Sequence, residues 1–331
     1  MYYTKSKAIL ITSILAFVCN IAVAQKKTTT SKTTTKSTAA TNNSITDQQA
    51  YAIIKYSNAV IDLHNSYLNA LKSHQSTLET GADQNVAKLK RNPNIQPFYI
   101  GCDRNSLSPE RDKANRTILK NIPAIPEKQN LQNLSTKALA HYDKTNTFCA
   151  DISNYFSKAA YKEDSNFAKY EVLKDSMLAN MKQCGFYWSE FAQLAANAGD
   201  RAELVLLKKN KLAAYIVPMK ESLIGIQQIT TMLNDQSIDV EIVNTKLATV
   251  QQLINQKMND KGTDFSKLSD IYYKEVYTKF FKECNNSTIT LQSVIDKIKT
   301  KASQQDISSA YSSASTSYNN AVQEYNTFIK Q

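Results

Sequence analysis

The sequence predicts an all-α fold, an elongated bundle of long antiparallel helices with a proline-rich irregular connection after the first helix. The chain has only six glycines among 331 residues, whereas average usage would be about 7%. Five of its six prolines lie between residues 93 and 126, so the remainder is nearly free of helix breakers. Apolar residues recur at helical spacing along most of the chain, and no window sustains the period of two that a half-buried strand requires.

Residues 1–24 have the organisation of a secretory signal peptide. Two lysines precede an apolar run over residues 8–18, and an Ala-Val-Ala cleavage site ends at Ala24. The apolar run is shorter than the roughly 20 residues that a membrane-spanning helix needs. We therefore expect cleavage after Ala24 and export to the periplasm or the medium. A lipid-anchored form acylated at Cys19 is the less favoured alternative, because Val18 and not a small residue precedes that cysteine.

Residues 25–44 form a low-complexity segment with eight threonines, three serines and four lysines. The segment has no aromatic residue, so burial cannot offset the entropy lost on ordering, and we expect a disordered linker. A helical bundle domain should then occupy residues 45–331, beginning at a helix N-cap at Thr46-Asp47. The sequence leaves open whether this domain is one bundle or two bundles joined near Gly199.

Helical periodicity predicts the elements of this domain. The first helix is expected over residues 47–79. The irregular connection then covers residues 81–128, with a short helix inside it at 109–120, because a structureless connection of that length is uncommon. The later helices are expected at about 129–161, 164–198, 205–233, 240–254, 264–300 and 304–330.

Apolar residues within 205–254 recur at coiled-coil intervals. They are seven apart over 205–233 and alternate by three and four over 240–254. One interpretation is a self-associating structural protein, a homo-oligomer in which these seams are completed by a second copy.

The sequence has no catalytic, cofactor-binding or metal-binding signature. The three histidines, His64, His74 and His141, lie outside zinc-binding spacings such as H-E-x-x-H, and no G-x-S-x-G nucleophile elbow occurs. Glu163 and Asp164 are explained by a helix N-terminus, where acidic residues complement the helix dipole. We therefore favour a non-enzymatic protein without a cofactor. The alternative is an envelope-acting enzyme with a site assembled across helices, which a cleft joining His64 or His141 to carboxylates would support.

Four cysteines follow the leader: Cys102, Cys149, Cys184 and Cys284. An even number in an exported chain permits two disulfides, with three pairings. Helix geometry argues against a Cys149–Cys184 pair, because the two positions would lie about 10 Å apart along neighbouring helices. Cys184 and Cys284 share helix faces with aromatic residues, so the other interpretation is that they are buried thiols acting as small hydrophobic residues.

Positive charge is concentrated in two segments. Residues 25–44 carry four lysines and no acid, and residues 81–128 carry nine basic and five acidic residues. A stripe of arginines interleaved with aromatic residues is absent, so we expect no nucleic-acid partner. Loops carry binding residues more often than scaffolds do. The candidate binding loop within 81–128 therefore comprises Lys88, Lys90, Arg91, Phe98, Tyr99 and Arg104.

Two segments carry a family resemblance. One comprises Tyr155-Phe156 and the motif Tyr161–Lys169 (YKEDSNFAK); the other is the terminal Tyr318–Ile329, echoed near the start of the domain by Tyr56-x-Asn58. These motifs resemble the YiiG-like family of bacterial envelope proteins, a domain of unknown function rich in long helices. The resemblance covers most of residues 45–331. It implies an exported helical protein and brings no catalytic residues.

The leader, the long helices and the lack of catalytic motifs together predict an exported, non-enzymatic helical protein. We expect it to bind another cell-envelope component or a surface polymer, and to have no transmembrane helix once the leader is removed.

Overall fold

The computed structural model describes residues 45–102, 107–233 and 239–330. The predicted signal peptide and the predicted linker lie outside these ranges, so both stay predictions. Within them the regular structure is helical and no strand occurs, which confirms the all-α prediction. The sequence predicts a bundle domain over 45–331 and leaves open whether it is divided near Gly199. The structure divides the described chain between Val205 and Leu206 into two compact units.

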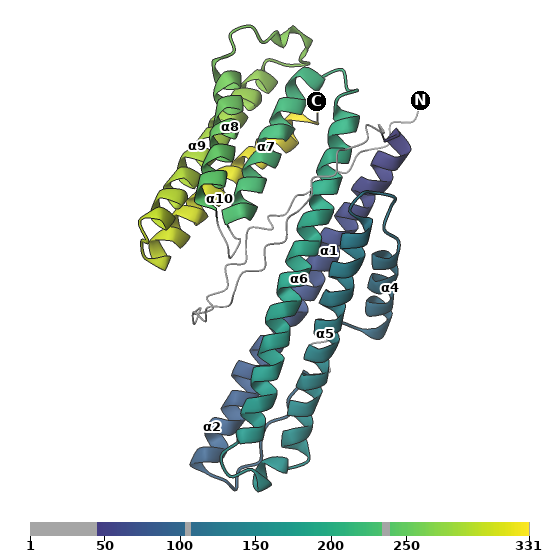
Figure 1. Cartoon of the computed structure of the whole chain (residues 1–331), viewed down its shortest axis with the longest axis vertical. Coiled ribbons are helices and arrows are strands. Elements are labelled where there is room, and N and C mark those ends of the chain that lie inside the picture. Colours follow the sequence, from purple (N-terminus) through teal and green to yellow (C-terminus); the bar gives the residue numbers. More distant parts are fainter. Residues whose placement is uncertain (1–44, 103–106, 234–238, 331) are drawn as a thin grey trace. The chain divides into compact units, whose positions relative to one another are not determined.

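The N-terminal unit, residues 45–205, is built from long helices. Figure 1 shows α1, α5 and α6 running side by side, with α4 against them. At 1.5 Å per residue the 40-residue α6 is about 60 Å long. The elements are α1 (Asp47–Thr77), a π-helix (Leu78–Ala82), α2 (Asp83–Arg91), α4 (Pro109–Lys120), α5 (Lys128–Ser157), a 3-10 helix (Ala160–Glu163) and α6 (Ala168–Leu207), whose last two residues belong to the second unit.

The C-terminal unit, from Leu206 onward, is a bundle around one apolar core. Its helices are α7 (Ala213–Leu233), α8 (Val240–Asn259), α9 (Tyr272–Lys299) and α10 (Gln304–Phe328), with a 3-10 helix (Phe265–Lys267) before α9. The predicted seam residues Val243, Leu247, Val250 and Ile254 are all buried in this core. The seam is therefore filled by helices of the same chain, so these residues do not support the prediction of a dimer.

Two predicted helix starts are confirmed, and a side chain caps each of them. Thr46 caps α1 in a capping box, in which its hydroxyl accepts from the Gln49 amide while the Gln49 side chain accepts from the Thr46 amide. The short helix expected at 109–120 is α4; Ser108 caps it and Pro109 occupies its first turn.

Gly81 does not end the first helix, contrary to the expectation that the irregular connection begins there. The chain continues through the π-helix and α2 to Arg91. The reason is packing: Leu78, Val86 and Leu89 extend the buried apolar face. A methyl group at Gly81 would lie 3.3 Å from the Ile100 side chain, so the glycine makes room for that contact.

Gly199 is likewise inside a helix, because α6 continues to Leu207 where an end near Ala198 was expected. A methyl group at Gly199 would lie 2.6 Å from the Ser57 hydroxyl, so the glycine allows α6 to approach α1 closely. The true break comes at residues 208–212, where the Asn210 side chain accepts from the Leu212 amide and α7 then begins at Ala213.

Helix α9 begins later than predicted. Residues 264–271 were expected to be helical, but α9 starts at Tyr272. The Asp264 carboxylate accepts from the Ser266 amide and the Asp270 carboxylate from the Tyr272 amide, so both side chains stabilise turns before the helix.

Candidate functional site

The segment after α2, residues 92–101, is called the strap here. It has no helix of its own and runs along the outside of the N-terminal unit. It begins with a turn in which the Ile95 amide donates to the Asn92 carbonyl, with Pro93 at the position where its fixed φ suits a turn.

Asn85 holds the centre of the strap. This buried side chain on α2 donates to the Phe98 carbonyl at 2.8 Å and accepts from the Phe98 amide at 2.7 Å. Both hydrogen-bonding groups of one strap residue are thereby satisfied by one side chain. The backbone that presents Phe98 is fixed without a neighbouring strand or helix.

The end of the strap is fixed by three further contacts. Ile100 is buried in the core formed by α2, α5 and α6, and its carbonyl accepts from the Ser153 hydroxyl at 3.0 Å. Immediately after the strap, Cys102 forms a disulfide with Cys149 on α5. The sequence left the partners of these cysteines open, and the structure pairs Cys102 with Cys149.

Phe98 and Tyr99 nevertheless point outward. Their side chains are 54% and 64% exposed, although Asn85 holds the Phe98 backbone and the next residue, Ile100, is buried. The Lys88 ammonium lies 3.7 Å from the centre of the Phe98 ring, which is a close cation–π contact. Lys88 and Phe98, predicted from sequence as part of a binding loop, are therefore in contact, and Tyr99 directly follows Phe98.

The remaining predicted residues have different positions. Lys88, Lys90 and Arg91 lie in the last turn of α2 and not in a loop, which corrects the sequence assignment. Lys90 contacts the Phe167 ring, with 5.6 Å between its ammonium and the ring centre. Arg104 lies outside the described residues.

The strap has one further exposed apolar residue that the sequence did not single out, Ile95, which is 37% exposed. The α2–strap surface is defined here as Lys88, Lys90, Arg91, Ile95, Phe98 and Tyr99.

The α2–strap surface is basic. Residues 84–102 contain three basic residues and no acid. The acid that precedes this range, Asp83, accepts from the Tyr170 hydroxyl at 2.7 Å and from the Lys174 ammonium at 2.6 Å, so its charge is paired with α6. The acid that follows the range, Asp103, lies outside the described residues. An anionic or aromatic group would find complementary partners here, whereas a cation would be repelled.

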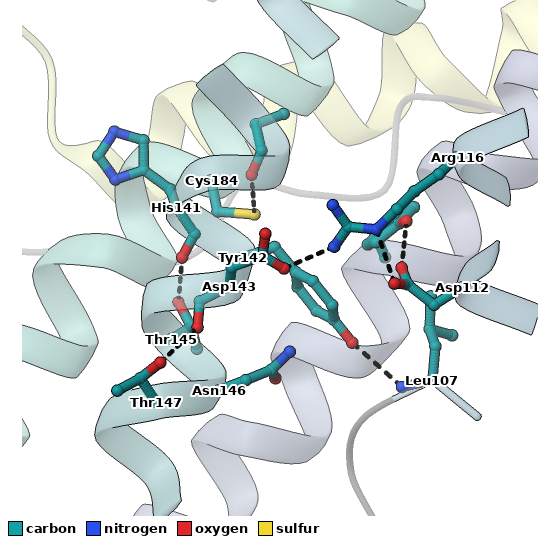
Figure 2. Close-up of polar contacts among 12 residues, drawn as sticks. Leu107, Asp112, Arg116, His141, Tyr142, Asp143, Thr145, Asn146, Thr147 and Cys184 are labelled. Atoms are coloured by element: carbon teal, nitrogen blue, oxygen red, sulfur yellow. Dashed lines mark hydrogen bonds and ion pairs between the residues drawn. The ribbon is translucent and has the colours of Figure 1, made fainter. Parts of the chain in front are cut away.

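A second polar cluster positions α4, as Figure 2 shows. Arg116 donates to Asp112 at 2.7 Å and to Asp143 on α5 at 2.6 Å. Tyr67 on α1 donates to Asp112 at 2.9 Å, and burial together with that carboxylate raises the pKa of Tyr67 well above its usual range. The Leu107 amide donates to the Tyr142 hydroxyl at 3.1 Å. Apart from the Arg116–Asp112 pair, which lies within α4, these contacts join α4 or the segment before it to α1 and α5, which is a structural role.

The three histidines contact amide and backbone oxygens. His64 donates to the Trp188 carbonyl at 3.2 Å, His74 to the Asn146 side chain at 2.8 Å, and His141 to the Asn180 side chain at 2.8 Å. Burial lowers the pKa of His64 and of His74, and these hydrogen bonds offset it in part. These contacts place the three imidazoles between helices, and within the described residues none of them pairs with a carboxylate.

Cys184 and Cys284 are free thiols buried in the cores of the N-terminal and C-terminal units. Burial raises the pKa of the Cys184 thiol to about 12 and that of Cys284 well above its usual range. Since the thiolate is the reactive form, both side chains act as small hydrophobic residues.

We expect neither thiol to react with a disulfide-exchange reagent at pH 8 while the protein is folded. In protein that begins at Gln25, two thiols per chain should react once denaturant is added, because the Cys102–Cys149 bond withholds the other two. Colorimetric titration with and without denaturant measures this. Rapid labelling of the folded protein would contradict the burial of the two thiols.

No group of His, Cys, Asp and Glu side chains within the described ranges is arranged to hold a metal ion. Among the helices described, none combines the length and apolar character needed to cross a membrane.

No family model and no curated protein matches the chain. Its structure is similar to the crystal structure of an uncharacterized DUF3829-like protein from Bacteroides thetaiotaomicron, with a TM-score of 0.46 and 15% identity over 83% of this chain and 98% of that one. It is also similar to an alpha helical protein from Bacteroides fragilis, with a TM-score of 0.43 and 18% identity over 80% and 98% of the two chains. The YiiG-like resemblance stays a prediction.

Proposed function

We propose that the chain is an exported, non-enzymatic helical protein that binds another cell-envelope component or a surface polymer through the α2–strap surface. One observation carries the proposal: Phe98 and Tyr99 are exposed aromatic residues, and Asn85 fixes the backbone there by hydrogen bonds to both the amide and the carbonyl of Phe98. Rigid aromatic side chains lose little entropy on binding, so such a surface favours recognition.

The proposed export is supported by two features. The leader has the three regions of a secretory signal peptide. A disulfide such as Cys102–Cys149 is typical of a protein in an oxidising compartment, since cytosolic thiols are normally kept reduced.

The test is cross-linking in intact cells, followed by mass spectrometry of what the tagged protein captures. A variant carrying Phe98→Ser and Tyr99→Ser should lose the captured partner, because the aromatic contact area is gone. Adding Lys88→Glu should weaken capture of an anionic partner further, because it reverses one of the three positive charges of the surface.

The chain provides a matched control. Tyr51 is 65% exposed and Phe186 is 49% exposed, both in the N-terminal unit and outside the α2–strap surface. Tyr51→Ser with Phe186→Ser therefore removes equivalent exposed aromatic area, and this variant should capture the partner normally. Equal capture by both double variants would overturn the assignment of the surface.

A further inference from the structure

One end of the C-terminal unit brings four chain segments together. Tyr215 near the start of α7 stacks on Phe265 with ring centres 5.9 Å apart and lies 6.1 Å from Phe328 at the end of α10. Tyr273 at the start of α9 is also 6.1 Å from Phe328. We call this end the tip; it comprises residues 208–212, 257–275 and 329–330.

The tip exposes large apolar side chains. Ile271 and Tyr272, at the start of α9, are 71% and 52% exposed. Met258 in the last turn of α8 is 45% exposed, and Ile329 after α10 is 36% exposed. All four side chains lie in turns or at helix ends, so exposed apolar groups accompany the aromatic cluster at this end of the unit.

The same tip is rich in lysine. It has eight lysines against four acids: Lys208, Lys209, Lys211, Lys257, Lys261, Lys267, Lys274 and Lys330 against Asp260, Asp264, Asp270 and Glu275.

Three of the acids also bind their own turns. Asp260 accepts from the Gly262 amide and the Thr263 hydroxyl, and Asp264 and Asp270 accept from the Ser266 and Tyr272 amides. The tip therefore combines a positive charge with an exposed apolar surface.

We propose that this tip docks onto a lipid surface that carries anionic headgroups. Lysines near an anionic leaflet are attracted by its surface potential, and isoleucine and tyrosine side chains enter the boundary between headgroups and acyl chains. A soluble polyanion would attract the lysines but would leave Ile271 in water. The combination of charge complementarity with exposed apolar side chains therefore favours a membrane surface.

The experiment is co-sedimentation of the whole protein with vesicles of phosphatidylcholine alone or with 30% phosphatidylglycerol. We expect binding to the anionic vesicles that weakens as salt is added. Ile271→Ser with Tyr272→Ser should weaken it about tenfold or more, because apolar burial is lost. Lys208→Glu with Lys211→Glu should weaken it about tenfold or more, since each lysine near the surface contributes about fivefold.

The matched control is Ile242→Ser with Ile289→Ser. Both isoleucines are 56% exposed in the same unit but outside the tip, so this variant should bind vesicles normally. The α2–strap variant Phe98→Ser with Tyr99→Ser should also bind normally, which separates this proposal from the proposed function. No binding to anionic vesicles would overturn the inference. So would binding that survives both tip variants, or binding that is equal on neutral vesicles.

Discussion

Replacing Cys102 and Cys149 by serine is expected to lower the free energy of unfolding of the N-terminal unit by about 4 kcal/mol. The bond closes a loop between residues 47 positions apart, and the chain-entropy model assigns that stabilisation to the restricted unfolded chain. The chain has a single tryptophan, Trp188, which is fully buried in this unit. Its fluorescence during urea denaturation therefore reports on the N-terminal unit specifically.

The control for this prediction is a reducing agent. The wild-type protein refolded under reducing conditions should show the midpoint of the double-serine variant, and that variant should be unaffected by the reductant. An unchanged wild-type midpoint under reduction would mean that the disulfide contributes nothing to stability.

Acidification should destabilise the N-terminal unit through His64 and His74. Both are almost fully buried, at 3% and 0% exposure, and burial lowers both pKa values below the usual 6.5. The unfolded chain therefore takes up protons first, and stability falls as the pH drops below about 6.5 until the lowered pKa values are reached. Each histidine contributes up to about 1.4 kcal/mol per pH unit in that window.

The measurement is the urea midpoint by Trp188 fluorescence at several pH values between 7.5 and 5. His64→Gln with His74→Gln should flatten the dependence, and each single substitution should remove part of it. His74 is the sharper case because its Nδ1 has no hydrogen-bond partner among the described residues, so a proton there would be buried without compensation. A slope that the double variant leaves unchanged would contradict the assignment.

How much of the fold can be predicted from sequence depends on whether a signal is local. The cap at Thr46 is a local signal, because its side chain satisfies an amide within the next turn, and the start of α1 was predicted from it. Gly81 and Gly199 are not local signals. Whether a glycine ends a helix or admits a neighbour depends on what faces it, and no sequence window shows that Ile100 and Ser57 do.

The candidate site divides in the same way. Lys88, Phe98 and Tyr99 were predicted from charge, aromatic character and the proline-rich context, and the structure brings Lys88 against Phe98 and leaves Tyr99 exposed. Asn85 was missed. The available signal was an amide side chain on the same helix face as the buried Leu89, but its partner is a backbone 13 residues away. The pairing of Cys102 with Cys149 likewise required the position of the strap end against α5.

The disulfide also changes what a single backbone cleavage does. Cys102 and Cys149 close a covalent ring that includes α4 and most of α5, so a cut between α4 and α5 leaves one connected molecule. The strap lies just before the ring. A cut there leaves α1 and α2 attached to the rest by packing alone. The Asn85 clamp and the burial of Ile100 suppress the local opening that a protease requires, so the contacts that present Phe98 and Tyr99 also protect the continuity of the chain.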